Sequence, residues 1–226
     1  MFKKLNWTNQ NLQENYRSPI SWWKTFSTIL TWHAIRTHGL EQIGWNKTRK
    51  SRLATVGGLP VPWWTYSSIQ FIDQTISSHA DILEVGGGSS SIFWANRGNR
   101  VVTLESNPQW IETIRSLTTS TSSRIEIVQI EEETPECISM TIGNQKFDVV
   151  INDGAGDRIQ IADLLLESLK PSGIMIWDNS ERSEYADKIH QIKNCGWKEL
   201  VFSGLGPINA YASSTSIFYK DEIRIH

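Results

Sequence analysis

Residues 81–91, DILEVGGGSSS, join a short apolar run to a turn made only of glycine and serine. A second apolar run, residues 101–104, ends at an acid, Glu105. Glycine lets the chain turn at positive φ and lets a ligand lie against the backbone without a Cβ in the way. A carboxylate at the end of the next strand can accept hydrogen bonds from both hydroxyls of a ribose. The stretch therefore predicts a crevice that binds a nucleoside.

The glycine turn leads into a helix that we expect to begin near Ser89. The first amide groups of a helix have no partner inside the helix, and they attract the anionic part of a ligand. The expected ligand-binding residues are Gly86, Gly87, Gly88, Ser89, Ser90 and Glu105. A glycine turn that only connects a strand to a helix is the alternative.

Two classes of ligand fit this crevice. A dinucleotide fingerprint needs a third glycine at the position of Ser91, so that match is incomplete. The segment 84–88, EVGGG, instead resembles the first motif of class I S-adenosylmethionine-dependent methyltransferases, an acid-x-Gly-x-Gly pattern. The resemblance implies that the turn lies along the methionine part of the cofactor, with Glu84 near its ammonium group and Glu105 on its ribose.

Length and composition narrow the class of protein. A chain of 226 residues suits one large α/β domain with an added segment. Its apolar runs are shorter than the ~20 residues of a membrane helix, and residues 1–7 lack the apolar stretch of a signal peptide. We therefore expect a cytoplasmic protein without a membrane span. The net charge of −2 argues against a surface built for nucleic acid, and Cys137 and Cys195 are too few for a disulfide framework or a metal cluster.

Short β-branched runs alternate with helical stretches from residue 66 onward, which predicts a doubly wound, Rossmann-like sheet. We expect helices over residues 66–79, 90–97, 109–117, 159–169 and 181–194. We expect strands over residues 82–85, 100–104, 124–130, 147–153, 174–177, 197–202 and 215–219, with a turn over 170–173. The last two strands should pair antiparallel. The resemblance implies such an ending: seven strands, mostly parallel, with an antiparallel last strand.

The predicted domain covers residues 61–226 and follows a Trp-rich, helical N-terminal extension, residues 1–60. An apolar stripe in that extension, from Ile20 to Ala34, could pack on the sheet domain or form a homodimer. We expect the acceptor pocket to be built from segments added to the common core. Tyr66 is the candidate for a cofactor or acceptor contact just before the core, and residues 204–211 are the candidate for a mobile wall.

Acidic side chains gather where the predicted strands end. In open α/β sheets the ligand lies beyond the carboxyl ends of the strands, which puts Glu84, Glu105, Asp153 and the pair Asp178 and Asn179 at the site. The last three resemble the magnesium site of catechol-type O-methyltransferases, although this chain lacks the lysine that follows the first acid in that family. The resemblance implies Mg²⁺ held by Asp153, Asp178 and Asn179.

A reading without metal also fits these residues. Asp153 would face the cofactor or act as general base, and Asp178 with Asn179 would cap a helix that starts near Ser180. Arg182 would pair with one of the acids, hold an anionic substrate, or remain an exposed helix residue.

These features favour an S-adenosylmethionine-dependent methyltransferase acting on a small-molecule acceptor, at oxygen, with Asp153 and Asp178 as the catalytic residues. Three alternatives stay open: an NAD-dependent oxidoreductase, an aminopropyl transferase, and an inactive protein that kept the fold as a partner surface. A nucleic-acid substrate is disfavoured, because the fourth strand ends INDGAG and not in the turn that such amino-methylating enzymes use to hold a flipped base.

Overall fold

The computed structural model describes residues 22–41, 43–46, 48, 53–118 and 124–220. The chain divides into two compact units, Met1–Gln42 and Ile43–His226. The second unit therefore includes residues of the segment between 43 and 60. The predicted residues before 22, among them Ile20 of the apolar stripe, lie outside the described part of the chain.

The described residues of the first unit form helix α2 (Trp22–Ala34), which continues as a π-helical turn, η1 (Ile35–Leu40). Large apolar side chains on it are exposed, including Phe26 and Leu30 of the predicted stripe. No described helix has the length and apolar character to cross a membrane. A homodimer formed through this extension stays a prediction.

The second unit is built on a seven-stranded sheet with the order β5-β4-β3-β6-β7-β9-β8. Its strands are β3 (Asp81–Val85), β4 (Arg100–Glu105), β5 (Ile125–Gln129), β6 (Phe147–Asn152), β7 (Leu169–Asp178), β8 (Lys198–Gly204) and β9 (Ser213–Tyr219). The pairs from β5 to β7 are parallel, whereas β9 lies antiparallel between β7 and β8. The predicted fold class is confirmed, including the antiparallel last strand.

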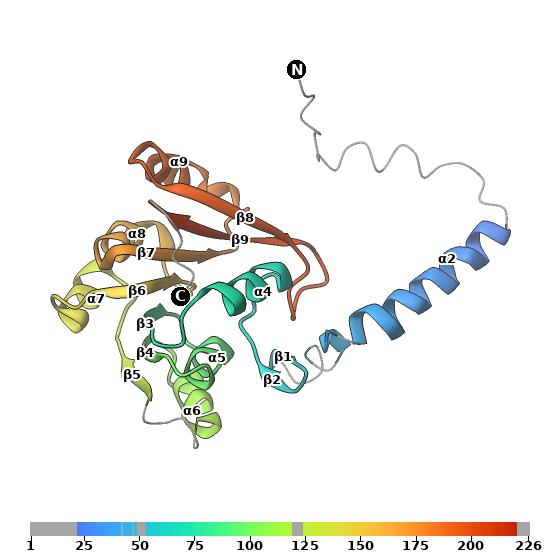
Figure 1. The fold of residues 1–226 in the computed structure, drawn as a ribbon, viewed down its shortest axis with the longest axis horizontal. Helices are drawn as coiled ribbons and strands as arrows, with labels where there is room; N and C mark the ends of the chain where they lie inside the picture. The colour runs from blue at the N-terminus through green and yellow to red at the C-terminus, as the bar shows by residue number, and fades with distance from the viewer. Residues whose placement is uncertain (1–21, 42, 47, 49–52, 119–123, 221–226) are drawn as a thin grey trace. The chain divides into compact units, whose positions relative to one another are not determined.

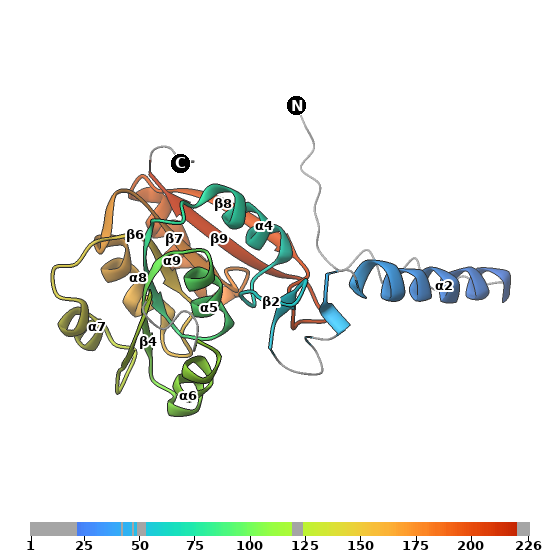
Figure 2. The same ribbon diagram turned by 60° about the horizontal axis from the view of Figure 1, so that its bottom comes forward.

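Helices cover both faces of this sheet (Figures 1 and 2). Their bounds are α4 (Tyr66–Thr75), α5 (Ser89–Asn96), α6 (Pro108–Leu117), α7 (Pro135–Ile142), α8 (Arg158–Glu167) and α9 (Ala186–Asn194). Alternate residues of the strands feed two buried apolar clusters. One cluster joins β3, β6 and β7 to α7, α8 and α9, and the other joins the same strands to α4 and α5. The central strands are therefore buried on both faces, as their continuous apolar sequences require.

Local sequence explains where the helices around the site begin. The Asn107 side chain accepts a hydrogen bond from the Gln109 amide at 2.9 Å, with Pro108 in the first helical position of α6. Asp157 caps α8 in the same way, accepting from the Ile159 amide at 2.9 Å. The two caps hold the helix starts next to the ends of β4 and β6.

Three elements differ from the sequence-based expectation. Residues 170–173 form part of β7 and not a turn, because Leu169 pairs with Phe147 and a register shift then lets β7 continue along β6. Residues 181–194 contain a short 3-10 helix, η3 (Ser183–Tyr185), before α9. Helix α7 was not expected, although Thr134 and Pro135 give it a cap and a proline start.

A hairpin was also missed just before the core. Strands β1 (Thr55–Val56) and β2 (Leu59–Pro60) pair antiparallel around Gly57 and Gly58, which have φ of 59° and 85°. Consecutive positive φ angles are what a tight hairpin turn requires. The hairpin carries the chain into residues 61–65, where Trp64 is fully buried in the core.

Candidate active site

A cavity of about 540 Å³ lies at the carboxyl ends of β3, β4, β6 and β7. Its volume is in the range of small-molecule and cofactor sites. The lining residues are Trp63, Gly86, Gly87, Gly88, Ser89, Ser90, Glu105, Ser106, Asn107, Trp110, Asp153, Gly154, Ala155, Arg158, Asp178, Asn179, Arg182, Ile208, Asn209 and Tyr211. The structure thus brings the predicted glycine turn together with the acids that end β4, β6 and β7.

The glycine turn is packed tightly beneath the cavity and open above it. Gly86 has φ of +90°, and a Cβ there would lie 2.6 Å from the Asp153 carbonyl oxygen. A Cβ on Gly87 would lie 2.6 Å from the Thr103 methyl group. A Cβ on Gly88 would meet nothing within 4 Å, so this residue faces the cavity.

This difference predicts opposite effects of two similar substitutions. Gly86→Ala should lower the free energy of unfolding by about 2–4 kcal/mol, because it combines an unfavourable φ with a backbone clash. Gly88→Ala should change stability by less than about 0.5 kcal/mol but weaken ligand binding, since its methyl group enters the cavity. Urea unfolding and ligand titration of both variants check this. Equal stability of the two would contradict the geometry.

Glu105 joins the glycine turn to the start of α6. One carboxylate oxygen accepts from the Gly87 amide and the other from the Asn107 amide, each at 2.7 Å. Its side chain is almost fully buried, yet it lines the cavity. Because each carboxylate oxygen has two lone pairs, both keep an acceptor site.

Glu84 lies under the turn and not in the cavity lining. Its carboxylate accepts from the Ser91 hydroxyl and, at 3.1 Å, from the Thr103 hydroxyl. The Ser91 hydroxyl also accepts from the Gly88 amide at 3.2 Å. Ser91, which stands where a dinucleotide-binding motif has its third glycine, therefore links the turn to Glu84. Burial raises the pKa of Glu84 to about 7. Its contact with an ammonium group stays a prediction.

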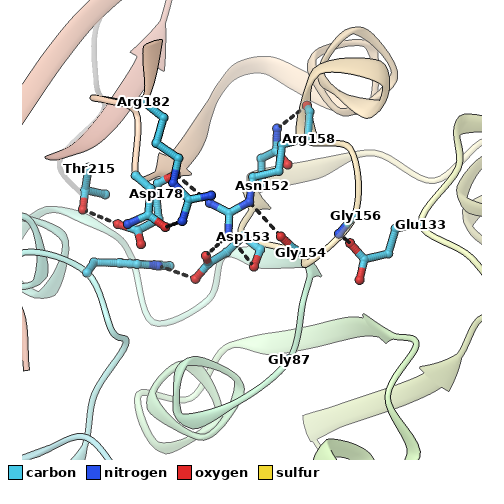
Figure 3. Close-up of polar contacts among 12 residues, drawn as sticks. Gly87, Glu133, Asn152, Asp153, Gly154, Gly156, Arg158, Asp178, Arg182 and Thr215 are labelled. Carbon is cyan, nitrogen blue, oxygen red and sulfur yellow. Dashed lines mark hydrogen bonds and ion pairs between the residues drawn. The ribbon is translucent and has the colours of Figure 1, made fainter. Parts of the chain in front are cut away.

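The acid that ends β6 is held by a buried arginine (Figure 3). Arg158 Nη2 lies 2.9 Å from Asp153 Oδ1, and the indole nitrogen of Trp64 donates to Asp153 Oδ2 at 3.0 Å. Arg158 Nε donates to the Gly154 carbonyl at 2.7 Å, and Asn152 holds the Arg158 carbonyl at 2.9 Å. Both oxygens of Asp153 are therefore fixed by protein donors.

Asp178, the acid that ends β7, joins Asp153 and Arg158 in one cluster. Arg158 Nη1 donates to the Asp178 carbonyl oxygen at 2.6 Å, and the Thr215 hydroxyl donates to Asp178 Oδ1 at 2.7 Å. Burial, reinforced by the negative charge of Asp153, raises the pKa of Asp178 to about 8. At neutral pH Asp178 thus carries a proton while Asp153 is ion-paired to Arg158.

The predicted magnesium site is not favoured by this arrangement. The Arg158 guanidinium already pairs with the Asp153 carboxylate and also donates to the Asp178 backbone carbonyl. Asn179 directs its side-chain oxygen to Arg182, which donates at 3.0 Å. Within the described residues, no group of three or more acids, histidines or cysteines could hold a metal. The expectation of Mg²⁺ at Asp153, Asp178 and Asn179 therefore stays a prediction, and these contacts do not favour it.

Known structures share the arrangement of the whole second unit. An O-methyltransferase from Bacillus cereus, in complex with S-adenosylhomocysteine, superposes with a TM-score of 0.56 at 16% identity, covering 85% of this chain and 97% of that one. The O-methyltransferase TomG from Streptomyces achromogenes, in complex with S-adenosylmethionine, gives a TM-score of 0.54 at 15% identity, with 80% and 88% covered. A precorrin-6y C5,15-methyltransferase from Geobacter metallireducens gives 0.57 at 17%, with 76% and 96% covered.

The chain has the fold of the class I S-adenosylmethionine-dependent methyltransferases. No protein-family model and no curated protein matches its sequence. At these identities the likeness of the methyltransferase structures establishes the fold, and the reaction has to be argued from the residues of the site.

Added segments supply the remaining walls of this methyltransferase fold. Ile208, Asn209 and Tyr211, from the loop between β8 and β9, line the cavity, as does Trp63 from the segment before α4. The two segments are fastened together. Tyr66 donates its amide to the Leu205 carbonyl at 3.0 Å, and a Cβ on Gly206 would lie 2.9 Å from the Trp64 carbonyl oxygen.

Tyr66 itself lies outside the cavity lining. Its side chain is half-buried, its hydroxyl has no hydrogen-bond partner among the described residues, and burial raises its pKa to about 12. Its role as a cofactor or acceptor contact stays a prediction. Asp178 and Asn179 do not cap a helix as the alternative expected, since η3 begins later and has no side-chain cap.

Several residues at the site were not expected from the sequence. Trp63 and Trp110 meet edge to face at 5.7 Å on the cavity wall, and Arg158 organises the acids. Glu133 accepts from the Gly156 amide at 2.8 Å and from the Ser106 hydroxyl at 3.2 Å, so it links the loops that follow β4, β5 and β6. The two tryptophans come from separate segments, and no short sequence pattern predicts their contact.

Proposed function

We propose that this protein is an S-adenosylmethionine-dependent methyltransferase that methylates an oxygen of a small-molecule acceptor. The observation that carries the proposal is one cavity with two chemically different ends. The glycine turn and Glu105 form one part of its lining, here called the cofactor end, and the neighbouring cluster of Asp153, Arg158 and Asp178 forms another, here called the acceptor end. A cofactor end and an acceptor end facing one space are what group transfer requires.

The cofactor end offers acceptors and donors suited to a nucleoside with a charged tail. Glu105 keeps an unused lone pair on each oxygen for the two ribose hydroxyls. Ser89 and Ser90 begin α5 and line the cavity, so their amides face a ligand carboxylate. Gly88 leaves room for the ligand to touch the backbone. These contacts fix the ligand without any covalent step.

The acceptor end supplies positioning and a base. A bound sulfonium cofactor would bring an already activated methyl group, so catalysis rests on alignment and exclusion of water. Burial raises the pKa of the Asp153 carboxyl, although the pair with Arg158 and the Trp64 hydrogen bond oppose this shift. Asp153 reaches the cavity, and a raised pKa makes its ionised form a stronger base. It can accept a proton from an acceptor hydroxyl within hydrogen-bond distance. Asp178, protonated at neutral pH, can donate a hydrogen bond there.

The sheet topology disfavours the oxidoreductase alternative. A dinucleotide-binding sheet has the strand order 3-2-1-4-5-6, whereas here the antiparallel strand β9 is inserted between β7 and β8. Ser91 also occupies the position of the third glycine and is hydrogen-bonded to Glu84. Both features support a sulfur nucleoside over NAD.

Calorimetric titration tests the proposal directly. The ligands are S-adenosylmethionine, S-adenosylhomocysteine, decarboxylated S-adenosylmethionine and NAD, titrated into the wild type, Glu105→Ala, Glu105→Gln and the exposed-acid control Glu112→Ala. We expect binding of both of the first two ligands. Glu105→Ala should weaken it by about 100-fold, because two hydrogen bonds to a charged group are lost. Glu105→Gln should lose less, and the control should match the wild type.

Other binding preferences would favour one of the alternative functions. Preference for NAD would favour the oxidoreductase, and preference for the decarboxylated ligand would favour an aminopropyl transferase. Failure of every ligand to bind a folded wild-type chain would contradict the proposal and favour a partner protein that kept only the fold. A thermal melt of each variant separates loss of binding from loss of folding.

A further inference from the structure

The cavity lining contains a cation, Arg182, that makes no ion pair among the described residues, although its charge acts on the more distant Asp153. Two arginines line the cavity, and Arg158 is ion-paired to Asp153. Arg182 has no carboxylate within 4.0 Å among the residues that the structure describes. Its neighbour Glu181 directs its carboxylate away, to the Ser214 amide at 2.7 Å.

Arg182 is nevertheless held in place by neutral partners. Its amide donates to the Asn179 carbonyl at 3.2 Å, and its Nη2 donates to the Asn179 side-chain oxygen at 3.0 Å. Its guanidinium carbon lies 5.9 Å from the centre of the Tyr185 ring. Asn179 has φ of +56°, a conformation that non-glycine residues adopt infrequently and that gathers at functional sites. The turn thus presents the guanidinium beside Asp178 (Figure 3).

Elsewhere the lining of the same cavity offers surfaces for a planar, apolar body. Trp63 and Trp110 face the cavity as an edge-to-face pair, and Ile208 and the exposed Tyr211 come from the opposite loop. Aromatic walls bind flat rings through their faces and edges. A guanidinium with remaining N–H donors binds carboxylates and phosphates through paired hydrogen bonds.

We propose that the acceptor carries an anionic group, a carboxylate or a phosphate, that binds Arg182 while its ring lies against the aromatic wall. This inference rests on the proposed methyltransferase function and adds the chemical class of the acceptor. A sulfonium in the neighbouring part of the cavity would add further positive charge, which reinforces the preference for an anion.

Three probes that share one ring separate charge from shape: 4-hydroxybenzoate, 4-hydroxyphenyl phosphate and the neutral 4-hydroxybenzamide. Each is titrated at 50 mM and 500 mM salt into protein saturated with S-adenosylhomocysteine. We expect at least one anion to bind about tenfold or more tightly than the amide, and less so at high salt. The anion that binds more tightly shows whether the site prefers a carboxylate or a phosphate group.

Three variants assign the preference to one side chain. Arg182→Gln should bring the anion and the amide within about twofold, and Arg182→Lys should keep part of the preference, because it retains charge without the planar donor pair. Arg115→Gln, which removes an exposed arginine of α6 outside the cavity lining, should keep all of it. Affinity for S-adenosylhomocysteine should stay within about threefold in all variants.

The result that overturns the inference is distinct from failure of the proposed function. If S-adenosylhomocysteine binds but no anion is preferred, or if the preference survives in Arg182→Gln, the anionic acceptor is wrong and the methyltransferase proposal stands. If S-adenosylhomocysteine does not bind the wild type, the proposed function itself fails, and the inference fails with it.

Discussion

Replacing Arg158 with methionine is expected to lower the free energy of unfolding by about 3–5 kcal/mol at pH 7. The guanidinium makes hydrogen bonds to the carbonyl oxygens of Gly154, Asp178 and Asp153 and an ion pair with the Asp153 carboxylate. Its side chain is only 8% exposed. Methionine retains the apolar stem but takes the Arg158 donors away from one carboxylate oxygen of Asp153, whose other oxygen keeps Trp64, and from three carbonyl groups.

Urea unfolding followed by tryptophan fluorescence measures this effect. The exposed-arginine control, Arg115→Met, should stay within about 0.5 kcal/mol of the wild type. The double variant Arg158→Met with Asp153→Asn should recover part of the loss, because the stranded charge is then removed. A single variant within about 1 kcal/mol of the wild type would show that the buried ion pair does not organise the site.

Asp178→Asn is expected to act in the opposite direction and to stabilise the protein by about 1–3 kcal/mol at pH 8. The pKa of Asp178 is raised to about 8 in the folded state, against ~3.9 in the unfolded chain. The folded protein therefore binds the extra proton between these values, and stability falls as pH rises from about 4 to 8. Asparagine keeps an acceptor for the Thr215 hydroxyl and removes the titrating group.

Unfolding free energies at pH 5, 6, 7 and 8 check the sign. Asp178→Asn should flatten the decline with pH, whereas the exposed-acid control Asp187→Asn should reproduce the wild-type slope. Some decline remains in the variant, because burial also raises the pKa of Glu84, to about 7, and the pKa of Asp153. An unchanged slope in Asp178→Asn would mean that this carboxylate is already ionised in the folded protein.

The cofactor end could be predicted because its information is local. A strand, a glycine turn, a helix and a second strand follow one another within residues 81–105, and each has its own sequence signal. Sequence also gave the antiparallel pairing of the last two strands, since a loop and not a helix separates them. The end-of-strand rule then placed Asp153 and Asp178 at the same edge of the sheet.

The acceptor end could not be predicted in the same way, because it depends on side chains that fold back and on contacts between residues far apart in the sequence. Arg158 follows the helix cap Asp157 and reads as the first residue of a surface helix, yet its side chain turns back under the loop to bind Asp153. That return replaces the cation that a cluster of acids had suggested. Trp64 reaches Asp153 across the sheet, and no spacing in the sequence records the contact.

The contact between the segment before α4 and the loop after β8 affects the order in which the parts of the cavity form during synthesis. The glycine turn and Glu105 emerge from the ribosome before Leu205, Gly206 and Thr215, which secure the segment that contains Trp63. Because chains fold from the N-terminus as they are made, a nascent chain can form the glycine turn and its contacts to Glu105 before the cavity is closed. Chains that stop short of β9 lack Thr215, which accepts from the Thr65 amide and donates to the Asp178 carboxylate, so the cavity wall and the acid cluster stay incomplete until this last strand of the sheet is made.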